Sequence, residues 1–204
     1  MKKFFSLLFL LLFISLSVYE SIGVAVRPWV TFYDGRNRFT NGIGNYGRNT
    51  QYYWVSTGIG SATETIDGAM SKWVNSNGTG VYTPISYRRT GTQSSSLIDF
   101  QKVPSRADNS SKGTVAWTSF WNGSTQQIPA AHKHWNWAQI ELHNRYFSSN
   151  STIQMRAMAH EIGHAFGLDH NPDSTSKLMY PSNISSMPTG PVTSELQGIN
   201  WLYK

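Results

Sequence analysis

The segment from His160 to His170 holds residues whose types and spacing suit a metal site. It reads HEIGHAFGLDH in one-letter code. His160 and His164 are four residues apart, so on a helix both imidazoles lie one turn apart on one face and can reach one ion. Gly167 can take a left-handed backbone conformation and end that helix, which lets the chain turn back and bring His170 to the same ion. Three neutral imidazoles leave the fourth corner of tetrahedral zinc open, as catalytic zinc sites require.

Glu161 is the candidate general base of this site. It stands between two histidines of the motif, where it cannot easily join both of them as a ligand. It can instead accept a proton from a water molecule on the open metal position, whose pKa zinc can lower to about 7. The same cation stabilises the oxyanion that forms on an attacked carbonyl. These residues therefore predict hydrolysis of an amide bond by one zinc ion and a metal-activated water, without a covalent intermediate.

A helix from about Thr152 to Phe166 must position the first two histidines and the glutamate. Ser151 and Gln154 have the spacing of a capping box, which favours a helix start just before the motif. One stripe of this helix is apolar and predicts a face packed on the core: Met155, Met158, Ile162 and Phe166. The histidines point away from that stripe, which favours a metal cleft over histidines that only form structural hydrogen bonds.

Five strands and two more helices are expected in the rest of the chain. The strand segments are separated by clusters of Gly, Ser, Asn and Pro, and their expected ranges are 51–55, 81–88, 96–103, 114–121 and 137–144. Apolar residues at helical spacing predict an amphipathic helix over 62–74, and a closing helix is expected over 193–203. This order of elements predicts an α+β domain.

The C-terminal quarter of the chain resembles a metzincin metallopeptidase, and within that group the matrixin type. The zinc motif carries the first part of the match. The second part is the sequence Leu178-Met179-Tyr180-Pro181, which resembles the Met-turn of the family. The third part is the segment 193–203, which resembles the closing helix of matrixin domains. The resemblance covers about 157–203, and upstream it depends on the order of the elements and on the sequence Ile98-Asp99-Phe100.

The resemblance implies a metzincin-like (zincin) fold, with a twisted five-stranded mixed sheet and two helices in an upper lobe. A small lower lobe would end in the closing helix. Met179 would form an apolar floor under the metal, where its thioether is not a ligand. Tyr180 and Pro181 would help to bind substrate, in the wall of the pocket for the side chain after the cut bond. An extended substrate would pair with the strand over 114–120 by strand addition.

The first 25 residues have the layout of a secretory signal peptide. Lys2 and Lys3 precede an apolar run, Phe4 to Val18, that is shorter than the ~20 residues of a membrane span. We therefore expect a secreted, extracellular protein that has no membrane attachment once the signal is removed. The catalytic domain would be 26–204, with an upper lobe over about 26–167 and a lower lobe over about 168–204.

Composition excludes several kinds of site. The sequence has no cysteine, which excludes a cysteine nucleophile, a cysteine ligand to zinc and latency through a cysteine. The formal net charge is +6, but basic residues form no run longer than Arg88-Arg89, so nucleic-acid binding is not indicated. Acidic residues are few and scattered, and no ligand set supports calcium.

Three other histidines and one aspartate are considered as further metal-site residues. His132, His134 and His143 lack the neighbouring aspartate of a second, structural zinc site, and solvated or hydrogen-bonded histidines are the preferred interpretation. For Asp34 a plain turn is the preferred interpretation. The alternative is that its carboxylate caps the metal in a precursor.

The favoured interpretation is a monomeric, secreted zinc endopeptidase that acts on protein or peptide substrates. Two alternatives stay open. The first is a binding protein that keeps the zinc fold without turnover. The presence of Glu161 and of all three histidines argues against it. The second is an amidase that acts on cell-wall peptide, because the motif fixes amide hydrolysis more firmly than it fixes the substrate.

Overall fold

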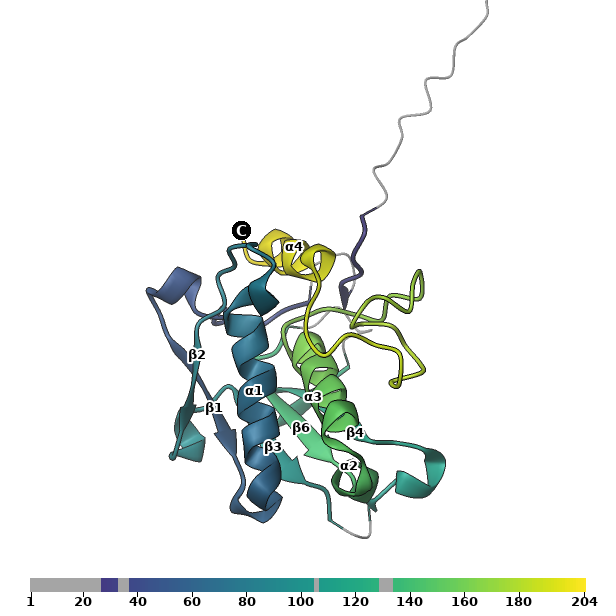
Figure 1. The fold of residues 1–204 in the computed structure, drawn as a ribbon. Helices are drawn as coiled ribbons and strands as arrows, with labels where there is room; N and C mark the ends of the chain where they lie inside the picture. The colour runs from purple at the N-terminus through teal and green to yellow at the C-terminus, as the bar shows by residue number, and fades with distance from the viewer. Residues whose placement is uncertain (1–26, 33–36, 105–106, 129–133) are drawn as a thin grey trace, which may run out of the picture.

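The computed structural model describes residues 27–32, 37–104, 107–128 and 134–204 (Figure 1). The expected signal peptide, Asp34 and His132 lie outside these ranges. The strands are β1 (Gln51–Val55), β2 (Tyr87–Thr90), β3 (Ile98–Lys102), β4 (Ala116–Asn122), β5 (Thr125–Gln127) and β6 (Trp137–Leu142). The helices are α1 (Thr63–Val74), α2 (Asn144–Ser148), α3 (Ser151–Ala165) and α4 (Thr193–Leu202).

The strands form one mixed sheet in the order β2-β1-β3-β6-β4-β5. β2, β1, β3 and β6 are parallel neighbours, whereas β4 runs antiparallel to β6 and β5 runs antiparallel to β4. All five expected strands are present, and β5 adds a sixth. It was not expected because it is only three residues long and polar, with the sequence TQQ. β2 begins at Tyr87, later than predicted, so most of 81–88 is irregular.

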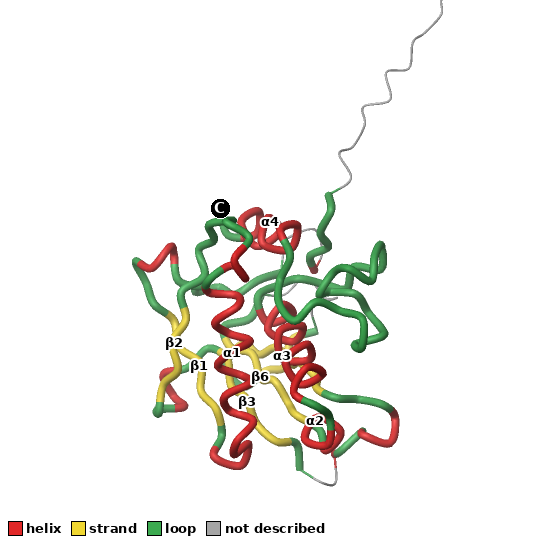
Figure 2. The backbone as a smooth tube through the Cα atoms, viewed as in Figure 1, coloured by secondary structure: helices red, strands yellow, loops and turns green. Residues whose placement is uncertain are grey.

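Helices α1 and α3 lie side by side on one face of the sheet, and α4 lies at one end of the molecule (Figures 1 and 2). The expected core residues of α1 are buried: Ile66, Ala69, Met70 and Trp73. The indole nitrogen of Trp73 donates a hydrogen bond to Ala159 O at 2.9 Å, which ties α1 to the middle of α3. Burying a large apolar side chain contributes about 1.5–3 kcal/mol, so this face fixes α1 on the core and against α3.

The start of α3 differs by one residue from the prediction. Asn150, not Ser151, is the N-cap, and its side chain accepts from Ile153 N at 3.0 Å. Gln154 does not complete a capping box, because its side chain donates instead to Tyr146 O at 3.0 Å. Both Asn and Ser are good N-caps, so sequence alone does not choose between neighbours.

The segment 27–32 lies against the end of α3 and the turn that follows it. Thr31 forms an antiparallel bridge with Leu168, and Asp169 N donates to Val30 O at 3.1 Å. Lys177 Nζ donates to Pro28 O at 2.6 Å. These bonds fasten the segment to the end of the metal motif and to the loop that follows it.

The mixed sheet with helices on one face is the expected α+β architecture. Among the described residues, no helix has the length and apolar character needed to span a membrane. The division into an upper and a lower lobe stays a prediction.

Candidate metal centre and adjoining cleft

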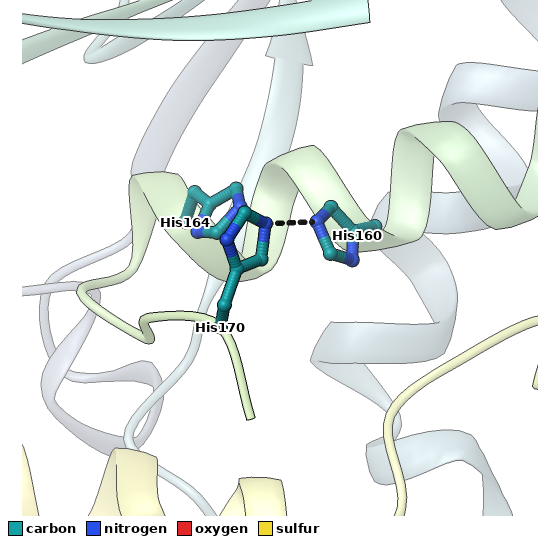
Figure 3. A group of neighbouring side chains, drawn as sticks. All are labelled: His160, His164 and His170. Atoms are coloured by element: carbon teal, nitrogen blue, oxygen red, sulfur yellow. Dashed lines mark hydrogen bonds between the residues drawn. The ribbon is translucent and has the colours of Figure 1, made fainter. Parts of the chain in front are cut away.

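The end of α3 brings the third histidine back towards the first two. Gly167 has a φ of 102°, the left-handed conformation that the sequence predicts. Gly167 N donates to His164 O at 2.8 Å, and Leu168 N donates to Gly163 O at 3.0 Å. This pair of bonds is a Schellman motif, which ends the helix and reverses the chain within one turn. His170 is thereby placed opposite the helix face that carries the other two imidazoles (Figure 3).

The three imidazoles point their Nε2 atoms at one small volume (Figure 3). His170 Nε2 lies 3.3 Å from His160 Nε2 and 3.2 Å from His164 Nε2. Nitrogen ligands at 2.0–2.1 Å from a tetrahedral zinc ion are about 3.3 Å apart. The spacing of the donor atoms therefore fits zinc.

Backbone carbonyls orient the two helical histidines. His160 Nδ1 lies 2.7 Å from Leu178 O, and His164 Nδ1 lies 2.8 Å from Leu168 O. A carbonyl accepts only, so each ring carries its proton on Nδ1 and presents a lone pair on Nε2. Both lone pairs face the third imidazole nitrogen, so a cation between the three nitrogens would be bound by all of them.

Burial keeps these rings neutral. It lowers the pKa of His160 to about 4, with a further contribution from the neighbouring His164. It lowers the pKa of His164 to about 3, and His170 acts in the same direction. Both rings are therefore unprotonated at neutral pH, which is the form that binds a metal.

Two other predicted histidines have ordinary partners in the described part of the chain. His134 Nδ1 accepts a hydrogen bond from Arg38 N at 3.3 Å, and His143 Nδ1 accepts one from Asn109 N at 3.0 Å. Within that part, the group of three histidines at 160, 164 and 170 is the one that could hold a metal ion.

Glu161 faces the cleft beside the histidines, and a hydroxyl from the sheet holds it. Thr118 Oγ1 on β4 donates to Glu161 Oε2 at 2.6 Å. Thr118 is buried and β4 is paired with β6, so the donor sits on a rigid strand. The sequence reading missed Thr118. Its signal is weak, because it is one of two short polar residues inside the aromatic run from Ala116 to Trp121.

The turn at Met179 is bonded both to the metal motif and to the closing helix. Met179 is buried against α3, since a Cβ placed on Gly163 would lie 2.5 Å from its Sδ atom. Met179 N donates to Glu195 Oε1 at 2.8 Å, and Val192 N donates to Glu195 Oε2 at 2.9 Å. Glu195 is buried, and burial raises its pKa.

The carboxylate of Glu195 thus fixes the turn whose Leu178 carbonyl orients His160. The sequence reading missed this residue as well. The sequence does carry a signal for Glu195, because an acidic residue lies on the apolar side of the closing helix.

An open cleft of about 780 Å³ contains the three histidines and Glu161. Its other walls are largely apolar and include Phe32, Trp117, Phe120, Ile128 and Pro181. Pro181 is on the wall, as predicted for a substrate-binding residue, whereas Tyr180 does not line it.

A second cavity, of about 420 Å³, borders the same catalytic candidates. It shares His160, Glu161 and Pro181 with the cleft and extends along α3 to Ala157. Arg145 of α2 also lines this second cavity.

One family model of metallo-peptidases matches most of the chain. Residues 40–203, which include all the strands and helices, match the Reprolysin_5 family model of metallo-peptidase family M12. Similar solved structures include myroilysin, with a TM-score of 0.49, 12% identity, and 81% of this chain and 97% of that chain covered. They also include high choriolytic enzyme 1, a hatching enzyme zinc-protease from the Medaka fish Oryzias latipes. For that protein the TM-score is 0.44, the identity 17%, and the coverage 82% of this chain and 92% of the other. No curated protein sequence matches.

Proposed function

The chain belongs to metallo-peptidase family M12, and from this premise we propose that it is a zinc-dependent endopeptidase with Glu161 as its general base. The membership confirms the expected metzincin metallopeptidase. The matching model is a reprolysin-type one, so the matrixin type remains a proposal, supported by the sequences around Met179 and in the closing helix.

The convergence of three Nε2 atoms is the observation that carries the proposal. His160, His164 and His170 would hold one zinc ion, because their donor spacing and their neutral state suit a three-nitrogen site. Bound there, zinc would polarise the substrate carbonyl and acidify a water molecule. Calcium stays an unsupported alternative, because no group of acidic ligands is found among the described residues.

Glu161 would accept a proton from the attacking water and later deliver it to the leaving amine. Thr118 occupies Oε2, which leaves Oε1 free for this transfer. The hydrogen bond also restricts the rotation of the carboxylate, so the base is positioned before substrate arrives.

An extended protein or peptide substrate would lie along the outer edge of β4. Within the described residues, β5 pairs only with Phe120 to Asn122, so the outer edge of Ala116 to Ser119 has no paired strand. An unpaired edge beside a catalytic cleft can take a peptide by strand addition.

We also propose that the protein is exported and acts as a monomer, with residues 1–25 as the signal peptide and 26–204 as the catalytic domain. The basic start and the short apolar run support the export and the signal peptide.

The substitution Glu161→Ala tests the mechanism. We expect kcat to fall by at least about a hundredfold on casein or a peptide, because general-base catalysis typically contributes that much or more. Zinc content, measured by elemental analysis, should stay near one ion per chain. Glu64→Ala is the matched control, since it removes the same charge from an exposed position of α1.

Near-normal turnover of the Glu161→Ala variant would remove this residue from the mechanism. Parallel incubation with casein and with purified cell wall separates an endopeptidase from a cell-wall peptide amidase. A zinc-loaded protein that is inactive on both substrates would instead support the binding-protein alternative.

A further inference from the structure

We propose that Arg145 makes the second cavity select a substrate with a glutamate side chain directly after the cut bond. This inference rests on the proposed peptidase function and names the substrate class of the same site.

The cavity has a catalytic end and a cationic end. At one end it is bounded by His160 and Glu161, and it follows α3 to Ala157, one helical turn earlier. One turn corresponds to about 5.4 Å along the axis. α2 lies beside the beginning of α3 (Figure 1), and its Arg145 lines the cavity.

The guanidinium group lies next to Gly113, where the wall has no side chain. A Cβ added at Gly113 would lie 3.7 Å from Arg145 Nη1, and the φ of this glycine is 87°. The left-handed backbone favours glycine here, and its lack of a side chain leaves the space beside the guanidinium open.

The charge of Arg145 is available to a ligand. Among the described residues, the ion pairs are Arg89 with Asp67 and Lys177 with Asp173, and neither of them uses Arg145.

Asp108 is the acidic residue that is hydrogen-bonded to α2, but both of its carboxylate oxygens already accept hydrogen bonds from other residues. They accept from the Ser110 hydroxyl at 2.7 Å and from the Asn144 side chain at 2.7 Å. An arginine without an acidic partner at the end of a cavity is suited to bind a carboxylate.

The cavity suits an aliphatic stem. Val115, Ile184 and Met187 also line the cavity. A side chain that enters past Glu161 therefore finds apolar wall residues for its stem and the guanidinium for its terminal group. Glutamate offers two methylene groups and a terminal carboxylate, whereas lysine or arginine would bring a like charge to Arg145.

The direction of β4 decides which substrate residue reaches the cavity. β4 runs from Ala116 to Asn122, and the cavity borders its beginning, at Gly113, Val115 and Ala116. A substrate that pairs antiparallel to the free edge runs the opposite way. The part that follows the cut bond therefore passes the cavity.

Peptides that differ only in the residue after the cut bond test this proposal. For the wild-type protein we expect kcat/KM to be roughly two- to fivefold higher with glutamate than with glutamine, the effect of an exposed charged pair. Lysine should give the lowest value. In Arg145→Gln the ratio of glutamate to glutamine should fall to about one, and in Arg145→Glu the preference should move to lysine. Arg88→Gln, an exposed arginine on β2, is the control that should keep the wild-type ratio.

A binding measurement separates this proposal from the proposed function. In the Glu161→Ala background, fluorescence anisotropy should show the glutamate peptide bound roughly two- to fivefold more tightly than the glutamine peptide, and Arg145→Gln should abolish the difference. Cleavage of both peptides at equal rates by wild-type protein would overturn the selectivity and leave the peptidase intact. Selective binding without cleavage by wild-type protein would overturn the peptidase and leave the selectivity intact. A wild-type preference that survives Arg145→Gln would assign the selectivity to another residue.

Discussion

The hydroxyl of Thr118 is predicted to hold the general base, and Thr118→Val tests this directly. Valine keeps the shape of threonine and removes the hydroxyl that donates to Glu161 Oε2 at 2.6 Å. The residue is 6% exposed, so little water reaches the carboxylate from this side to replace the lost donor.

A hydrogen bond to a charged group contributes about 1.5–3 kcal/mol. Each 1.36 kcal/mol changes a rate about tenfold, so full loss of positioning lowers kcat roughly ten- to hundredfold. Because Thr118 donates to the base and not to the backbone of the substrate, we expect KM to stay within about twofold.

Steady-state cleavage of a fluorogenic peptide by zinc-loaded protein is the assay. Thr118→Ser keeps the hydroxyl and is expected to retain activity within about threefold of wild type. Elemental analysis and denaturant unfolding should show that all three proteins bind one zinc ion and remain folded. If the folded, zinc-loaded Thr118→Val protein turned over as fast as the serine variant, the hydroxyl would have no role in positioning the base.

Three further predictions concern the metal ligands and their supports. His170→Ala should weaken zinc retention at least about a hundredfold, and full zinc occupancy after dialysis would place the third ligand elsewhere. Glu195→Gln should lower the free energy of unfolding by about 1–3 kcal/mol, because an amide nitrogen replaces one of the two oxygens that accept buried backbone N–H groups. A change below about 0.5 kcal/mol in urea titrations would show that Glu195 does not support the turn. In metal-free protein, stability should fall as the pH drops from about 6.5 to 4, because the folded pKa values of His160 and His164 are lowered to about 4 and 3 while the unfolded chain takes up protons near 6.5. The expected slope is on the order of 1.4 kcal/mol per pH unit for each ring, and a flat profile would show that the rings are not buried and neutral.

Local patterns were sufficient to predict the helix, its left-handed end and the three histidines. The apolar stripe of α3 and the glycine at 167 act within a few residues of the metal motif, so the sequence carries them directly. The same holds for α1, whose expected core residues are buried. The N-cap was predicted one residue late because two adjacent residues could both cap the helix.

The missing parts depend on contacts between distant segments or on very short elements. Thr118 and Glu161 are 43 residues apart, and Met179 and Glu195 are 16 apart, so no periodicity links either pair. β5 and α2 have three and five residues, too few for a hydrophobic pattern. Tertiary packing selects such elements, and α2 matters here because it carries Arg145.

The central claim is that three imidazoles hold one zinc ion beside Glu161. An anomalous difference map, from crystals of the protein grown with zinc and measured at the zinc edge, tests it most directly. We predict one strong peak within 2.0–2.2 Å of the Nε2 atoms of His160, His164 and His170. A map with no peak there, or with a zinc ion bound by other residues, would contradict the claim.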